Sequence, residues 1–393
     1  MHETPPKKAE QAADDPPAPP AAETPGRSID DGRGRVFPCE QCGGELVFNI
    51  GDQRLKCPHC GFEKEIVVPK DAAVAEQDFQ AMLDRLQEQR ASGDQAEKRE
   101  ETQNHVCCES CGATVVFVGT LTSLECPYCG SPILREHIHT GGWRVPVDGV
   151  LPFAVVRERA AENFVGWARS RWFAPNEFVK RADSGKFNGV YLPFWTYDAV
   201  TASTYRGRRG EWYLVTVGSG KDERQERRTR WWPVAGQFQL VFDDILVAAT
   251  SGIRRDLIDG LSPWPLDRCL PFTQDVLAGF MARTYDVDLK DGFDQARTHI
   301  DSAIANEART RIGGDEQIVD NIQTAFGAIT FKHLLLPVWL MAYRYQERTY
   351  QVLVNASTGE VDGERPYSSW KIAAAVVSGL LLALALVYFY NQR

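Results

Sequence analysis

Two copies of one cysteine pattern constrain this chain more than any other feature of its sequence. Each copy holds two Cys-x-x-Cys pairs with fourteen residues between them, in CEQCGGELVFNIGDQRLKCPHCG (39–61) and CESCGATVVFVGTLTSLECPYCG (108–130). Thiolate pairs at this spacing are typical of zinc ribbons, in which two tight turns present four sulfurs to one tetrahedral metal ion. The sequence therefore predicts two ribbons with one structural Zn²⁺ each. The predicted ligands are Cys39, Cys42, Cys57 and Cys60 in the first ribbon, and Cys108, Cys111, Cys126 and Cys129 in the second.

A closed site of four cysteines leaves no coordination position for a substrate, so neither zinc ion is predicted to be catalytic. The remaining sequence shows no recognisable set of nucleophile, base and orienting residue. GSGKD (218–222) has Val215 where a phosphate-binding loop needs glycine, and the glycines of GGDE (313–316) are explained as a helix stop. Asp243 and Asp244 are neighbours on an expected strand, so their side chains should point to opposite faces. We therefore expect a protein that is not an enzyme.

The stretch IAAAVVSGLLLALALVYFY (372–390) carries no charge over nineteen residues. As a helix it is long enough for the roughly 30 Å hydrocarbon core of a bilayer. Trp370 and Lys371 precede it, and Tyr388 to Arg393 close it, as membrane-interface residues do. No apolar segment typical of a secretion signal stands at the start, and the thiol pairs suit a reducing compartment. The sequence predicts a single-pass, tail-anchored protein with its bulk in the cytoplasm.

Composition and periodicity divide the chain into six parts and predict an α+β fold. The central part alternates strand-like runs with two amphipathic helices, which favours an antiparallel sheet. The predicted parts are a disordered Pro/Ala-rich tail (1–34), ribbon 1 (35–69), an amphipathic helix with a charged linker (70–104), ribbon 2 (105–135), the α+β domain (142–366) and a transmembrane helix (371–390).

A weaker repeat lies inside the α+β domain. LPFWTYDAVTASTYRGRRGEWYLVTVG (192–218) parallels LPVWLMAYRYQERTYQVLVNASTG (336–359), since each joins Leu-Pro-x-Trp to an alternating strand, a polar turn and a second strand. The pattern predicts two related hairpins in a pseudo-symmetric sheet. The alternative is that two unrelated strands share common residues.

A basic and aromatic stretch runs from Arg206 to Trp232, with eight Lys or Arg against four Asp or Glu and three Trp. It suits a solvated hairpin tip, contact with anionic lipid, or nucleic acid. The candidate contacts are Arg206, Arg208, Arg209, Arg224, Arg227, Arg228 and Arg230. The net charge of −9 and the acidic balance of both ribbons disfavour broad phosphate binding.

The paired CxxC…CPxCG units resemble those of the bacterial membrane-anchored double zinc-ribbon proteins. FNGVYLPFWTYDA, FDDILVAAT, TFKHLLLPVWLMAYRY and VNASTGEVDGERPYS, before a terminal apolar helix, extend the resemblance over nearly all of the chain after the tail. Such proteins are described as TFIIB-type zinc ribbons, or as primosomal protein N′ (replication factor Y), a superfamily II helicase. The resemblance implies a place in the inner membrane and partners among phage-shock-type or flotillin-like (SPFH) membrane-stress proteins.

Three functions follow as expectations. The first is an adaptor that recruits proteins to the inner membrane through two ribbons, whose modest affinities combine on one tether. The alternative is a membrane-tethered nucleic-acid-binding protein, as the helicase description suggests. The third is an enzyme with an unrecognised site in the α+β domain.

Overall fold

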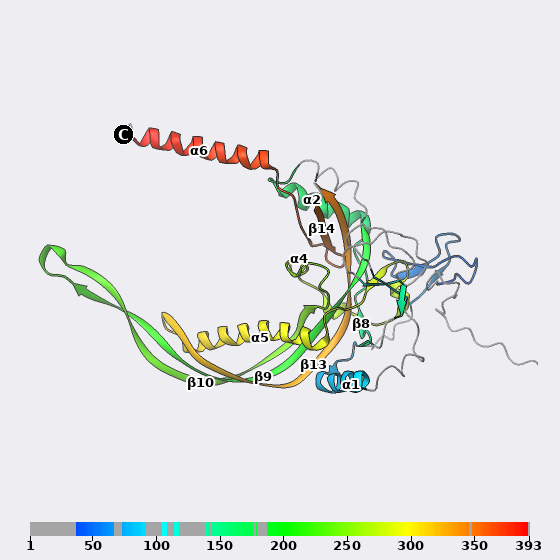
Figure 1. Cartoon of the computed structure of the whole chain (residues 1–393), viewed down its shortest axis with the longest axis horizontal. Coiled ribbons are helices and arrows are strands. Elements are labelled where there is room, and N and C mark those ends of the chain that lie inside the picture. Colours follow the sequence, from blue (N-terminus) through cyan, green and yellow to red (C-terminus); the bar gives the residue numbers. More distant parts are fainter. Residues whose placement is uncertain are drawn as a thin grey trace, which may run out of the picture.

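The computed structural model describes residues 37–66, 73–91, 104–107, 114–117, 138–140, 144–175, 178, 187–345 and 348–391. The predicted tail, and the four cysteines of the second predicted ribbon, lie outside these residues. The described chain has a mixed α+β architecture built on a curled, mainly antiparallel sheet, which confirms the predicted fold class at that level (Figure 1).

The sheet is organised around four neighbouring strands in the order β10-β9-β13-β14. Their bounds are Arg224–Ala248, Asn188–Val217, Glu316–Tyr345 and Arg348–Asn355, and β15 (Val361–Gly363) adds to the outer side of β14. The sequence predicted two strands within 190–218, whereas β9 is one continuous strand of 30 residues. A single strand can continue because β10 and β13 pair with it on both sides from Phe194 to Gly210.

Helix α5 (Leu289–Ile312) covers the concave face of the long strands (Figure 1). Ile300, Ile304 and Ile312 recur on one face of this helix and pack on Tyr205 and Phe238 of β9 and β10. The helix ends where Gly313 adopts φ +64°, a left-handed conformation that favours glycine. Successive side chains of a strand point to opposite faces of the sheet, and Val200 and Val241 are exposed on the face away from α5.

Shorter elements close the rest of the domain. Helix α2 (Arg157–Ser170) buries Ala160, Phe164 and Ala168, which recur on one face of the helix. The remaining short elements are β8 (Gly149–Val150), α4 (Arg255–Asp259), β11 (Leu270–Pro271), β12 (Met281–Arg283) and the 3-10 turns η3 (Gly220–Asp222), η4 (Leu266–Arg268) and η5 (Gln274–Leu277). Strand β8 pairs in parallel with β13, and β12 in parallel with β9, so the sheet is not wholly antiparallel.

Segments that precede the domain in sequence also join its sheet. Strand β4 (Gln77–Asp78) pairs with β13, and helix α1 (Phe79–Ala91) buries Phe79 and Met82 against the same core as Tyr197. Strands β5 (Asn104–Cys107), β6 (Thr114–Phe117) and β7 (Ile138–Thr140) extend the sheet beyond β12.

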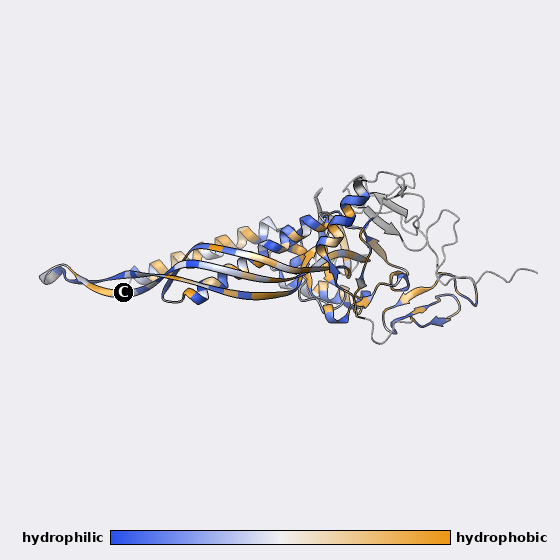
Figure 2. Cartoon of the chain, turned by 90° about the horizontal axis from the view of Figure 1, so that it is seen from below, coloured by the Kyte–Doolittle hydropathy of each residue, from blue (hydrophilic) through white to orange (hydrophobic). Residues whose placement is uncertain are grey.

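Helix α6 (Ser369–Asn391) projects from the body of the protein, and its apolar side chains are not buried by other residues (Figure 1). It is long and apolar enough to cross a membrane. Figure 2 shows the elongated form of the molecule, with the end of the β9–β10 hairpin and the cysteine-bearing β1–β3 segment at opposite ends.

Candidate metal centre

The first ribbon brings its four predicted ligands together. The Sγ atoms of Cys39 and Cys60 are 3.5 Å apart, as are those of Cys42 and Cys57, and all four sulfurs lie within 4.8 Å of one another. Zinc–sulfur bonds of about 2.3 Å in a tetrahedron require sulfur separations of about 3.8 Å. The cluster can therefore hold one zinc ion. The corresponding cysteines of the second ribbon lie outside the described residues.

Two equivalent turns position these sulfurs. Gly43 donates its N–H to the Cys39 carbonyl (2.8 Å), and Gly61 donates to the Cys57 carbonyl (3.0 Å). Both glycines have positive φ values, +69° and +77°, that other residues rarely adopt. Strands β1 (Val47–Asn49), β2 (Arg54–Lys56) and β3 (Glu63–Lys64) form the small sheet that connects and supports the turns.

The thiols show the electrostatics of a cation site. Backbone N–H groups of Cys60 and His59 point at the Cys57 sulfur and, against burial, lower the pKa of Cys57 to about 6. The Gly44 amide lowers the pKa of Cys42, but contacts with the sulfurs of Cys60 and Cys57 raise it to about 12. Four thiolates this close repel one another, so they cannot all ionise unless a cation lies between them. A divalent metal ion resolves that conflict, and its binding releases protons.

The cysteine-bearing segment that was predicted as ribbon 1 packs against the domain. Phe48 donates its N–H to the Ala278 carbonyl (3.0 Å), and the Gln53 side chain donates to the Phe153 carbonyl (2.8 Å). Leu46, Leu55 and Cys57 belong to the same buried cluster as residues of α2 and the long strands. Nothing in the sequence predicts these contacts, because both acceptors are backbone carbonyls, of Ala278 and Phe153, that any residue could supply.

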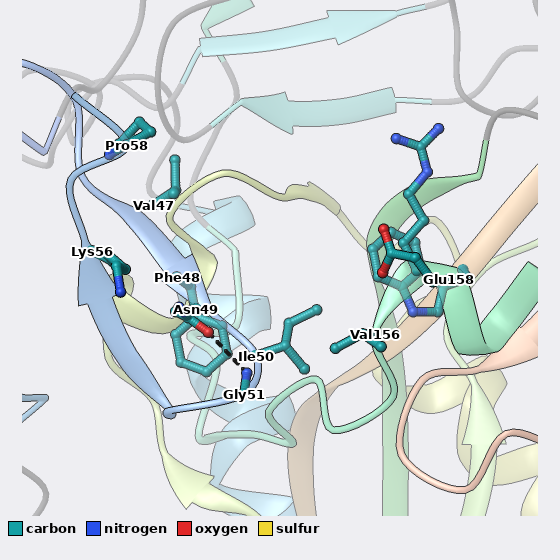
Figure 3. A pocket seen from close by; sticks show the side chains of 11 residues that line it. Val47, Phe48, Asn49, Ile50, Gly51, Lys56, Pro58, Val156 and Glu158 are labelled. Carbon is teal, nitrogen blue, oxygen red and sulfur yellow. Dashed lines mark hydrogen bonds between the residues drawn. The ribbon is translucent and has the colours of Figure 1, made fainter. Parts of the chain in front are cut away.

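A hollow of about 340 Å³ opens where ribbon 1 meets the start of α2 (Figure 3). Val47, Phe48 and Ile50 line its ribbon side, and Val156 and Glu158 line the α2 side. Most of the exposed lining is apolar, and Lys56 and Arg157 also line it. This surface combines residues of the ribbon with residues of the α+β domain.

The Lys and Arg side chains that the structure describes in ribbon 1 all pair with acidic ones. Within residues 37–66, Lys56 pairs with Glu63 (2.9 Å), Arg54 with Glu65 (3.0 Å) and Lys64 with Glu40 (3.3 Å). Each pair neutralises a charge that phosphate binding would require. The described ribbon surface is therefore poorly suited to nucleic acid.

The seven candidate arginines lie on the distal part of the β9–β10 hairpin. Arg206, Arg208 and Arg209 are on β9, and Arg224, Arg227, Arg228 and Arg230 are on β10. Five have partners in the protein. These are Arg208 with Asp320, Arg209 with Glu211, Arg228 with Glu226, Arg227 over the Trp212 ring (4.0 Å) and Arg230 over the Tyr213 ring (5.0 Å). Beyond Gly210, where pairing with Glu316 begins, the described hairpin is two-stranded.

One carboxylate cluster contradicts the sequence expectation. A β-bulge between Phe242 and Ile245, with Asp244 at φ +52°, breaks the strand alternation. As a result, Asp243 and Asp244 do not diverge, and their oxygens come within 4.8 Å of each other and of Asp198. Lys332 Nζ lies 2.8 Å from Asp244 and 3.8 Å from Asp198, so a lysine already supplies the cation of this group.

Comparisons with known proteins give limited identification. No family model matches the chain, and no solved structure matches it. An uncharacterized protein, YdjG of Bacillus subtilis strain 168, is 26% identical over 356 residues, which cover 89% of this chain and 96% of that protein. The similarity therefore extends over most of both chains.

Proposed function

We propose that this protein is a tail-anchored, cytoplasm-facing adaptor of the bacterial inner membrane that recruits proteins through two zinc ribbons. The observation that carries the proposal is the arrangement of the two specialised segments. The cysteine cluster of ribbon 1 lies at the end of the molecule opposite the free end of α6, with the α+β domain in between (Figure 1). An anchor on one side and a metal-stabilised surface on the other suit a scaffold.

Protein is the better ligand for ribbon 1 because of its surface chemistry. The three Lys and Arg residues within 37–66 are paired with carboxylates, which leaves little charge there for phosphates. The neighbouring hollow has a mostly apolar lining with a few charged residues, Lys56, Arg157 and Glu158, as pockets that receive a partner's side chains commonly have. The resemblance to double zinc-ribbon membrane proteins adds phage-shock-type or flotillin-like membrane proteins as the partners to test.

Nucleic-acid binding remains the second candidate because of the β9–β10 hairpin. Trp212 and Trp232 are exposed there beside several arginines. Most of these arginines already have partners within the protein, which weakens the argument for nucleic-acid binding. Binding of DNA or RNA that falls steeply with salt, and that Arg227→Ala with Arg228→Ala removes, would favour it over the adaptor function.

The test is co-purification of the full-length protein from nuclease-treated, detergent-solubilised membranes. A Cys57→Ser, Cys60→Ser variant removes two ligands of ribbon 1, and Cys269→Ser serves as the matched control because Cys269 lies outside both ribbons. The adaptor function predicts membrane proteins that are enriched with the natural chain and the control but lost with the ribbon variant. Equal recovery of partners with all three proteins would contradict recruitment by ribbon 1.

A further inference from the structure

Two segments far apart in sequence meet where α6 begins. The chain after α2 turns through residues 171–175, and its carbonyl groups bind the chain entering α6. Ser368 donates its N–H to the Phe173 carbonyl (2.8 Å), and Lys371 Nζ donates to the Ala174 carbonyl (2.8 Å) across 197 positions of sequence. The position of the α2 loop is thereby tied to the first turn of the apolar helix.

The surface at this junction is aromatic and exposed. Trp172 is 62% exposed, Phe173 39%, Tyr367 59% and Trp370 81%. We name these four residues the aromatic corner. The rings of Trp172 and Phe173 contact each other edge to face at 5.0 Å, so the loop presents one apolar surface rather than scattered side chains.

Cations accompany the aromatic corner. Arg365 lies over the Tyr367 ring at 5.5 Å, Arg171 lies over the neighbouring Trp167 ring at 5.1 Å, and Lys371 joins the two segments. Membrane proteins are enriched in Trp and Tyr, together with Lys and Arg, at the headgroup level of a bilayer. There the rings contact the apolar part of the interface, and the cations contact lipid phosphates. Free in water, four such rings would form an exposed apolar patch.

We propose that the loop of Trp172 and Phe173 is a second membrane contact, inserted at the headgroup level beside the start of α6, which sets the orientation of the α+β domain on the bilayer. The proposal rests on the membrane anchor of the proposed function. Its occupant is the lipid interface, because the loop is continuous with the residues that enter the membrane at Trp370.

The contacts at the base of α6 fix where the aromatic corner lies. The hydrogen bonds of Ser368 and Lys371 to the carbonyls of Phe173 and Ala174 hold the corner beside the first turn of α6. If α6 enters the bilayer at Trp370, the aromatic corner therefore lies at the headgroup level.

The test is ¹⁹F NMR of the full-length protein labelled with 5-fluorotryptophan, in phosphatidylcholine nanodiscs with and without doxyl-labelled lipid. The conservative variants Trp172→Phe, Trp370→Phe and Trp232→Phe assign three signals. Trp232 is the matched control, because it is also exposed (49%) but lies on the hairpin. The proposal predicts roughly twofold or greater broadening of the Trp172 and Trp370 signals by doxyl lipid, with Trp232 unchanged.

The outcomes separate this inference from the anchor. Broadening of Trp370 without Trp172 overturns the second contact and leaves the anchor in place. Broadening of Trp232 without Trp172 also overturns it, and assigns lipid contact to the arginine-rich hairpin instead. If Trp370 itself is not broadened, α6 is not in the bilayer and both proposals fail.

Discussion

Leu192 of β9 and Leu336 of β13 lie directly opposite each other in the antiparallel ladder, and each begins a Leu-Pro-x-Trp segment. Equivalent residues that face each other in an antiparallel pair mark a pseudo-twofold axis. Ala249 donates its N–H to the Pro193 carbonyl (2.9 Å), and Ala356 donates to the Pro337 carbonyl (3.0 Å). The two Leu-Pro-x-Trp segments therefore occupy equivalent places in the sheet, which supports a repeat, although 192–217 is part of one continuous strand and not the predicted hairpin.

The structure also corrects the extent of the repeat. The second strand of the later copy, VLVNASTG (352–359), corresponds to ILVAATSG (245–252) and not to the expected YLVTVG (213–218). The first copy thus carries a long excursion, the distal β9–β10 hairpin, between its two equivalent strands. The sequence comparison missed this because the excursion separates the matching segments and contains a similar alternating strand of its own.

The two repeat tryptophans should contribute alike to stability. Trp195 donates its indole N–H to the Val287 carbonyl before α5 (2.9 Å), and Trp339 donates to the Val155 carbonyl before α2 (2.7 Å). Trp195→Phe or Trp339→Phe leaves a carbonyl without this donor, and we expect each to lower the free energy of unfolding by about 1–3 kcal/mol. Urea denaturation of the detergent-solubilised protein measures this loss. Trp232→Phe, which is exposed, should change little; similar losses in all three variants would contradict the expectation.

Removal of the metal should affect more than the ribbon. The natural chain is expected to carry two zinc ions, and Cys57→Ser with Cys60→Ser one, as measured by elemental analysis of the purified protein. Because Phe48 donates to Ala278 and ribbon residues share the domain core, hydrogen exchange should also quicken around residues 276–280. Unchanged exchange there, together with loss of zinc, would show that ribbon 1 folds independently of the domain.

His333 should make the protein sensitive to mild acid. Burial lowers the pKa of His333 from 6.5 to about 4, and its Nδ1 lies 3.2 Å from the Val145 carbonyl. The unfolded chain therefore takes up this proton first as the pH falls. The contribution of His333 to the free energy of unfolding does not change above pH 7. Between about pH 6.5 and 4 the free energy of unfolding falls by about 3 kcal/mol in total. Unfolding measured from pH 7 to 4 should have a smaller slope in His333→Gln; equal slopes would contradict a buried neutral histidine.

Lys332 should stabilise the fold only while its acidic partners are present. Its ammonium lies among Asp244, Asp198 and Glu76, and only 12% of its side chain is exposed. Lys332→Met leaves these carboxylates to repel one another, so we expect a loss of stability on the order of 2 kcal/mol. Adding Asp244→Asn should restore part of that loss, and additive losses in the double-mutant cycle would argue against the coupling.

Local chemistry was readable from the sequence because it depends on residues close together in the chain. The spacing of the cysteine pairs indicated the metal turns, and apolar patterns indicated two amphipathic helices in the domain and the membrane-length helix α6. The tertiary structure alone decided which distant segments meet. It placed Phe48 of the ribbon on Ala278, brought Asp198 to Asp244 through a bulge, and tied Lys371 to Ala174. These contacts depend on strand register and on backbone carbonyls that every residue possesses, so the residue types in the sequence do not predict them.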